Sequence, residues 1–198
     1  MKKLNWIKLA TVIFCGLIMA GSMFAATPTQ TIKNANTKLA SAVKAAKTDA
    51  AAIEAVSKVL ASASDFSSMA NSVTSSYCEK LTAKQCTEFN ETFINLVKVS
   101  TASKLKGYKS EKISYTGEKI EGSTATVKTT VKSGDNTVNI DYILKKSGSN
   151  WLIINYVVED INTVDNYKKQ FKRLFKKNSF DEVMQNLNKR ITKIKSGK

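Results

Sequence analysis

The sequence predicts an α+β protein whose helices pack on a highly curved antiparallel sheet of four or more strands, and three observations support this class. Apolar residues recur at helical spacing over the first half of the chain. They alternate with polar residues from about residue 113 to 144, and helical spacing returns after about residue 166. Helices followed by hairpin-connected strands and further helices favour this plan over alternating βαβ units.

The N-terminal segment 1–26 is predicted to be a cleavable signal peptide. Three lysines precede an apolar run from Leu9 to Met19, and small residues follow it, which is the order of regions in a secretory signal. A membrane anchor is the alternative, although this run is shorter than the ~20 residues that a bilayer crossing needs. We therefore expect a periplasmic protein with a single domain at 27–198.

Capping residues mark the starts of the predicted helices. A helix from Thr31 to about Ala63 is expected to break near Thr48, with Asp49 capping its second part. Asp65 caps a helix that carries Phe66 and Met69 on one face. The next helix starts with a capping box and the last helix with a similar Ser-x-x-Glu pattern. These two patterns are Thr82 with Gln85 and Ser179 with Glu182.

Three strands are predicted from alternation and a fourth from a continuous apolar run. The inward positions of the three are Ile113 and Tyr115, then Ala125, Val127, Thr129 and Val131, then Val138, Ile140, Tyr142 and Leu144. Trp151 opens the fourth, which includes Ile153 and Val157 and is predicted to be covered on both faces. Turns rich in Gly, Ser and Asn join them as a meander.

Cys78 and Cys86 lie eight residues apart across a predicted break between two helices. The break can bring their Cα atoms to within the ~6 Å that a disulfide requires, and the periplasm is oxidising. The alternative is two separately buried thiols.

The composition argues against common forms of catalysis. The chain has no histidine, which removes the commonest general base and metal ligand. The adjacent acids Glu159 and Asp160 are more typical of a solvated corner than of a catalytic pair. No Gly-rich phosphate loop is present. We therefore assign no catalytic residue, metal site or cofactor.

The charge balance is strongly basic. Lys2, Lys3 and Lys8 belong to the signal segment, so 28 of the 31 basic residues remain against 16 acidic ones, a formal charge near +12. A secreted bacterial chain meets anionic membrane lipids before nucleic acid, so we expect no nucleic-acid partner. Solvated helix faces are the alternative explanation of the charge.

Several motifs together resemble one family. The stretch 151–171 is similar to the pattern W-x-V-x-D-V-x-I-x-G-V-S-L…N-Y-R-x-Q-F of the MlaC, or toluene-tolerance (Ttg2), family of periplasmic phospholipid-binding proteins. Asn155, Asp160 and Asn162 stand where that pattern has Asp, Gly and Ser, and Lys168 stands where it has Arg. The segments 65–70 and 81–93 resemble two further motifs, D-F-x-x-M-A and L-T-x-x-Q-x-x-x-F-x-x-x-F, in the same order along the chain.

The resemblance implies a cone of helices and sheet that holds the acyl chains of a phospholipid in an apolar pocket. It also implies, as partners, an inner-membrane ABC-type lipid transport complex and an outer-membrane lipoprotein assembly. An ordinary filled core, a small enzyme on the same cone with an apolar substrate and a cationic protein that binds membrane surfaces are the alternatives. The residues expected to line or support the pocket are Phe66, Met69, Phe89, Phe93, Val127, Val131, Ile140, Tyr142, Ile153, Val157, Tyr167 and Phe171.

Overall fold

The computed structural model describes residues 26–106, 112–133 and 135–196, so the predicted signal segment, Ala26 apart, lies outside the described residues. Six helices and five strands are found in the described part of the chain. The helices are α1 (Pro28–Ala45), α2 (Asp49–Ala63), α3 (Phe66–Cys78), α4 (Ala83–Leu105), α5 (Thr163–Lys177) and α6 (Phe180–Lys195). The strands are β1 (Lys112–Glu121), β2 (Thr124–Ser133), β3 (Asn136–Ser147), β4 (Asn150–Val158) and β5 (Ile161–Asn162).

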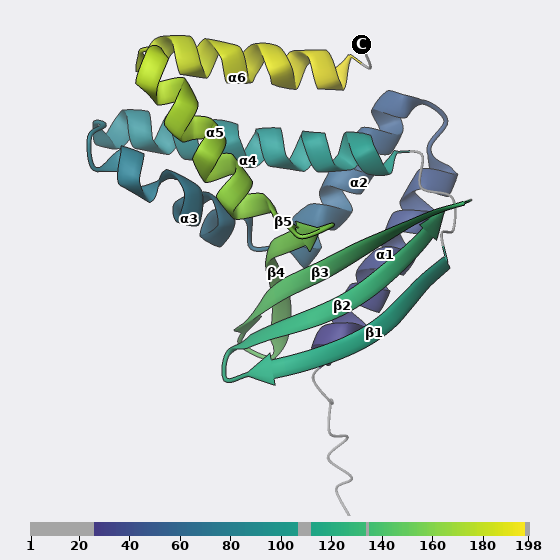
Figure 1. Ribbon diagram of the computed structural model, residues 1–198. Coiled ribbons are helices and arrows are strands. Elements are labelled where there is room, and N and C mark those ends of the chain that lie inside the picture. The colour runs from purple at the N-terminus through teal and green to yellow at the C-terminus, as the bar shows by residue number, and fades with distance from the viewer. Residues whose placement is uncertain (1–25, 107–111, 134, 197–198) are drawn as a thin grey trace, which may run out of the picture.

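The strands form one antiparallel meander in the order β1-β2-β3-β4-β5, which confirms the predicted α+β class. The sheet is strongly bent and open, and α1 crosses behind it, while α3 to α6 gather beyond its β4 edge (Figure 1). Gly122 and Gly148 take positive φ values of 60° and 59° in two of the hairpin turns. An L side chain rarely adopts such angles, so glycine suits both positions.

Side-chain caps explain where most helices begin. The two expected capping boxes, at Thr82 and Ser179, are both present. The prediction for α2 was wrong by one residue: the Thr48 hydroxyl accepts from the Ala51 amide, and Asp49 lies inside the first turn. At that position its carboxylate still interacts favourably with the positive end of the helix dipole.

The buried apolar residues separate into a helical core, a core between α1 and the sheet, and a small third core that joins α1, α2 and α4 through Leu39, Ile53, Val56 and Ala102. The helical core joins α3, α4, α5 and α6 around Phe89, Phe93 and Phe171. The second core packs Ile32 of α1 on Val127 and Leu144 of the sheet. The site described below lies in the space that remains between these cores.

Cys78 and Cys86 form a disulfide between the end of α3 and the start of α4, with their Cα atoms 5.0 Å apart. The bond closes the predicted helix break. None of the helices in the described ranges is both long and apolar enough to cross a membrane.

Candidate functional site: an apolar cavity

A cavity of about 170 Å³ lies between the inner face of the sheet and helices α1, α2 and α4. Its wall carries no charged side chain among the described residues. Helix α1 contributes a stripe at i, i+3, i+4 and i+7, and both tyrosines in the wall come from the sheet. The lining residues are Ile32, Ala35, Asn36, Leu39, Val59, Leu60, Ala63, Ser64, Phe66, Thr101, Leu105, Ile113, Val131, Ile140, Tyr142, Ile153, Tyr156 and Val158.

The cavity is closed at one end of the sheet and more exposed at the other. Along β2, Val127 and Thr129 are buried, whereas Val131 is half-buried. Ile113, which pairs with Val131, and Ile140, which pairs with Thr129, are half-buried as well. The apolar wall therefore opens toward the hairpin that joins β2 and β3.

Two hydrogen-bonded pairs supply polar atoms to the wall. The Asn36 amide donates to the Tyr115 hydroxyl at 3.0 Å, which joins α1 to β1. Thr101 and Tyr156 share a hydroxyl–hydroxyl bond of 3.0 Å between α4 and β4. Burial raises the pKa of Tyr156, so its hydroxyl stays neutral. The cavity thus offers apolar surface and paired polar groups, a setting for an uncharged aliphatic ligand.

Five of the twelve residues expected at the pocket line this cavity: Phe66, Val131, Ile140, Tyr142 and Ile153. Val127 lies at the closed end of the sheet instead, packed with Leu144 and Trp151.

Val157 lies outside the cavity because β4 contains a bulge. Leu144 pairs with Ile153, and Ile143 pairs with Asn155, so Ile154 is an extra residue in β4. The insertion reverses the alternation. Tyr156 and Val158 therefore line the cavity, and Val157 does not.

The remaining five expected residues, Met69, Phe89, Phe93, Tyr167 and Phe171, belong to the helical core or pack against it. The Phe171 ring meets the rings of Phe89 and Phe93 edge-on, with centroids 5.0 and 5.3 Å away. Such edge-to-face pairs are favourable beyond their buried area. These side chains support the helices behind the cavity rather than its wall.

Sequence reasoning missed most of the helical wall. Ile32 and Leu39 of the α1 stripe were visible in the sequence at helical spacing, but this spacing does not identify the packing partner of the helix. The cavity is also smaller than the several hundred Å³ that ligand sites usually have. Aromatic side chains from α3, β3 and β4, those of Phe66, Tyr142 and Tyr156, take up part of the space.

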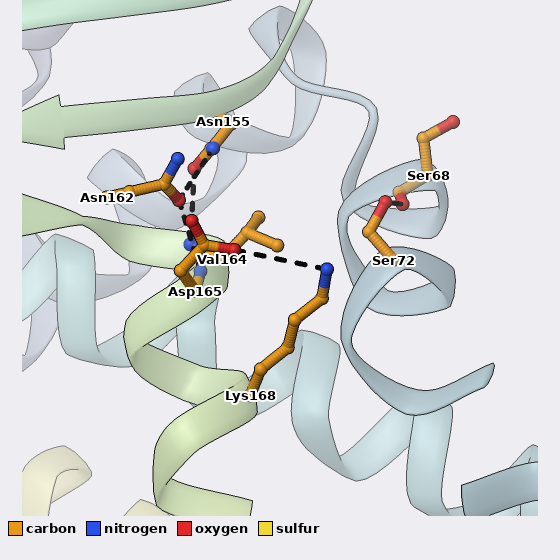
Figure 2. Close-up of polar contacts among 7 residues, drawn as sticks. All are labelled: Ser68, Ser72, Asn155, Asn162, Val164, Asp165 and Lys168. Carbon is orange, nitrogen blue, oxygen red and sulfur yellow. Dashed lines mark hydrogen bonds and ion pairs between the residues drawn. The ribbon is translucent and has the colours of Figure 1, made fainter. Parts of the chain in front are cut away.

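The bulge in β4 also directs Asn155 to the start of α5 (Figure 2). The Asn155 side-chain oxygen accepts from the backbone amides of Tyr156 and Val164, at 2.8 and 3.2 Å. Asn162 caps the helix by accepting from the Asp165 amide at 3.1 Å. Lys168, one turn further on, lies 4.0 Å from the Asp165 carboxylate, and its side chain extends toward α3 (Figure 2).

The two adjacent acids form a turn between β4 and β5. Glu159 and Asp160 have φ values of 46° and 61°, a region that Asp tolerates better than most residues. The Glu159 carboxylate accepts from the Asn139 amide and so fixes the end of β3. Within the described ranges, no three His, Cys, Asp or Glu side chains gather where they could hold a metal ion.

Comparison with known proteins gives a family match and solved structures of similar fold. A family model described as MlaC protein matches residues 29–189. A solved structure of a phospholipid-binding protein from Ralstonia solanacearum, in complex with a phospholipid, is similar with a TM-score of 0.70 at 18% identity. The alignment covers 83% of this chain and 96% of that chain. Comparison with curated proteins finds no match.

Proposed function

Because this chain belongs to the MlaC protein family, we propose that it is a periplasmic carrier that binds a phospholipid by its acyl chains and moves it between membranes. The observation that carries the proposal is the uncharged, largely apolar cavity between α1 and the sheet. The phospholipid held by the Ralstonia protein of similar fold supports it. The predicted signal segment supports the periplasmic location.

Acyl chains need such an enclosure. Two chains carry about 30 methylenes, and at ~0.8 kcal/mol each their exposure to water would cost roughly 24 kcal/mol. A shallow groove recovers too little of this free energy. The lining residues Ile140 and Ile153 of the sheet would face one side of the lipid tails, and Leu39 of α1 would face the other.

The cavity must widen to hold two chains. Its volume of about 170 Å³ is below the ~300–1,000 Å³ that ligand sites usually have. The junction of α1 with β1 is a suitable place to open. Its polar contacts include the bond from Asn36 to Tyr115 and one from the Thr29 amide to the Glu118 carboxylate, at 2.7 Å. Both can be exchanged for water without leaving a buried charge.

The carrier would exchange lipid with an inner-membrane ABC-type complex and an outer-membrane lipoprotein assembly, without a chemical step or a cofactor. Native mass spectrometry of mature protein purified from a bacterial periplasm tests the central point. We expect one phospholipid per chain. Folded protein that never carries lipid, whether purified or mixed with phospholipid vesicles, would refute the proposal.

A further inference from the structure

Helix α5 presents six cations to solvent, and this surface is not explained by the cavity. No α5 residue lines the cavity. The helix packs through Phe171 and Val164, and all six cations are exposed. We call this surface the α5 cationic face; its members are Lys168, Lys169, Lys172, Arg173, Lys176 and Lys177.

The spacing of these cations works against the helix. Lys168, Lys172 and Lys176 form one i, i+4 row, and Lys169, Arg173 and Lys177 form a second. Like charges at this spacing repel and destabilise a helix. Only Lys176 and Lys177, in the last turn, gain from the helix dipole. The charges in the middle of the helix therefore need another explanation.

Few acidic groups neutralise the face. Of its six members, only Lys168 lies within 4.0 Å of a carboxylate in the described ranges, that of Asp165. A local arrangement that opposes folding without compensation is more typical of functional surfaces than of structural ones.

We propose that the α5 cationic face docks the protein on an anionic lipid surface. The two exposed large apolar residues of the described chain, Ile120 and Ile161, both lie outside α5. Protein interfaces usually centre on apolar or aromatic anchors. A bilayer rich in anionic headgroups instead attracts distributed positive charge without an anchor. The helix is about 22 Å long, enough to span several headgroups.

The docking face and the cavity are separate surfaces, so the inference does not depend on lipid being carried. Vesicle binding and copurified lipid can be measured on the same sample.

The test compares two variants of the mature protein with equal loss of charge. In the first, Lys169→Gln, Lys172→Gln and Arg173→Gln remove the middle of the face, since glutamine keeps the helix propensity. In the control, three exposed lysines outside α5 are replaced by glutamine; these are Lys38, Lys84 and Lys146. Docking is measured by flotation with phosphatidylglycerol vesicles and, separately, with phosphatidylcholine vesicles. Binding to poly-glutamate is measured beside them.

We expect the parent to bind phosphatidylglycerol vesicles at low salt, to release them at high salt, and to ignore phosphatidylcholine. Each lysine or arginine at an anionic surface is worth about fivefold in partitioning, so the face variant should bind about 100-fold more weakly. The control should bind within a few-fold of the parent, and all three proteins should keep the same copurified lipid.

Three results would overturn the inference. Equal losses in both variants would show that net charge, not the face, attracts the vesicles. Equally strong binding of poly-glutamate would point to an acidic protein partner instead. A parent that ignores phosphatidylglycerol at low salt would exclude the lipid surface altogether.

Discussion

The side-chain amide of Asn155 donates a hydrogen bond of 2.9 Å to the side-chain oxygen of Asn162, which links the bulge of β4 to the cap of α5. Both amide orientations are fixed by other contacts. Two backbone amides donate to the Asn155 oxygen, and the Asp165 amide donates to the Asn162 oxygen. Asn155 must therefore act as a donor toward Asn162, a role that aspartate cannot fill.

Asn155→Asp should destabilise the protein by about 1–3 kcal/mol, because two acceptor oxygens would then face each other in a buried place. Urea unfolding measures the change. In Asn155→Asp/Asn162→Ser, the serine hydroxyl can donate to the new carboxylate, as in the family pattern that has Asp and Ser here. The double variant should regain most of the free energy of unfolding that Asn155→Asp loses. Additive effects would show that the two side chains are not coupled.

Adjacent valines in β4 provide a matched test of the cavity wall. Val158→Glu places a carboxylate on the wall, where it must lose its hydration or admit water, so it should abolish copurified phospholipid. Val157, one residue earlier, lies outside the wall, so Val157→Glu should keep most of the copurified phospholipid. Native mass spectrometry counts the lipid, and circular dichroism checks the fold. Equal lipid in two folded variants would remove β4 from the proposed site.

The disulfide should contribute about 2–3 kcal/mol, given the eight-residue separation of Cys78 and Cys86. Cys78→Ser/Cys86→Ser should lower the free energy of unfolding in urea by that amount. Reducing agent should lower the parent to the same level and leave the double variant unchanged. Unreduced parent that takes up an alkylating reagent at either cysteine would show that the bond is not formed.

Tyr167 should make the protein sensitive to alkali. Burial, together with the smaller effect of the nearby Tyr156, raises its pKa to about 12. A tyrosine in the unfolded chain ionises near pH 10. The stability that depends on a neutral Tyr167 is therefore complete below pH 10 and is lost as the pH rises from about 10 to 12. A pKa two units above that of the unfolded chain corresponds to a loss of about 3 kcal/mol.

Tyr167→Phe tests this at pH 8 and pH 11 by urea unfolding. The variant should lose less stability between these values than the parent does. Lysines also lose charge in this range, but they do so in both proteins. Identical losses would mean that Tyr167 ionises as easily in the folded chain as in the unfolded one.

Local features were predictable from the sequence because they depend on neighbours in the chain. The capping boxes at Thr82 and Ser179 and the alternation along β2 and β3 follow from such short patterns. The disulfide also lies across a local break. Alternation also predicted that Val131, Ile140 and Tyr142 lie on the inward face of the sheet, the face that lines the cavity.

The rest depends on which apolar surfaces meet, and periodicity does not specify this. The stripe that contains Phe89 and Phe93 could have faced the sheet, but it packs on Phe171 of α5. One inserted residue in β4 places Val157 outside the cavity wall and its neighbours Tyr156 and Val158 in it. A continuous apolar run in the sequence gives no sign of the insertion. The Thr48 cap was misplaced because threonine and aspartate are both good capping residues.

The cavity between the hydrophobic cores is a packing defect with a thermodynamic consequence. At ~24 cal/mol per Å³, about 170 Å³ of unfilled space corresponds to roughly 4 kcal/mol of lost stability, a large part of the 5–15 kcal/mol that keeps a domain folded. Selection for stability alone would fill it, for instance by enlarging Ala35 or Ala63. Such a cavity gives up stability of the chain in exchange for space that a ligand can occupy. The aromatic helical core reaches the cavity wall through Phe66 alone among its buried residues, so most of its packing does not depend on what the cavity holds.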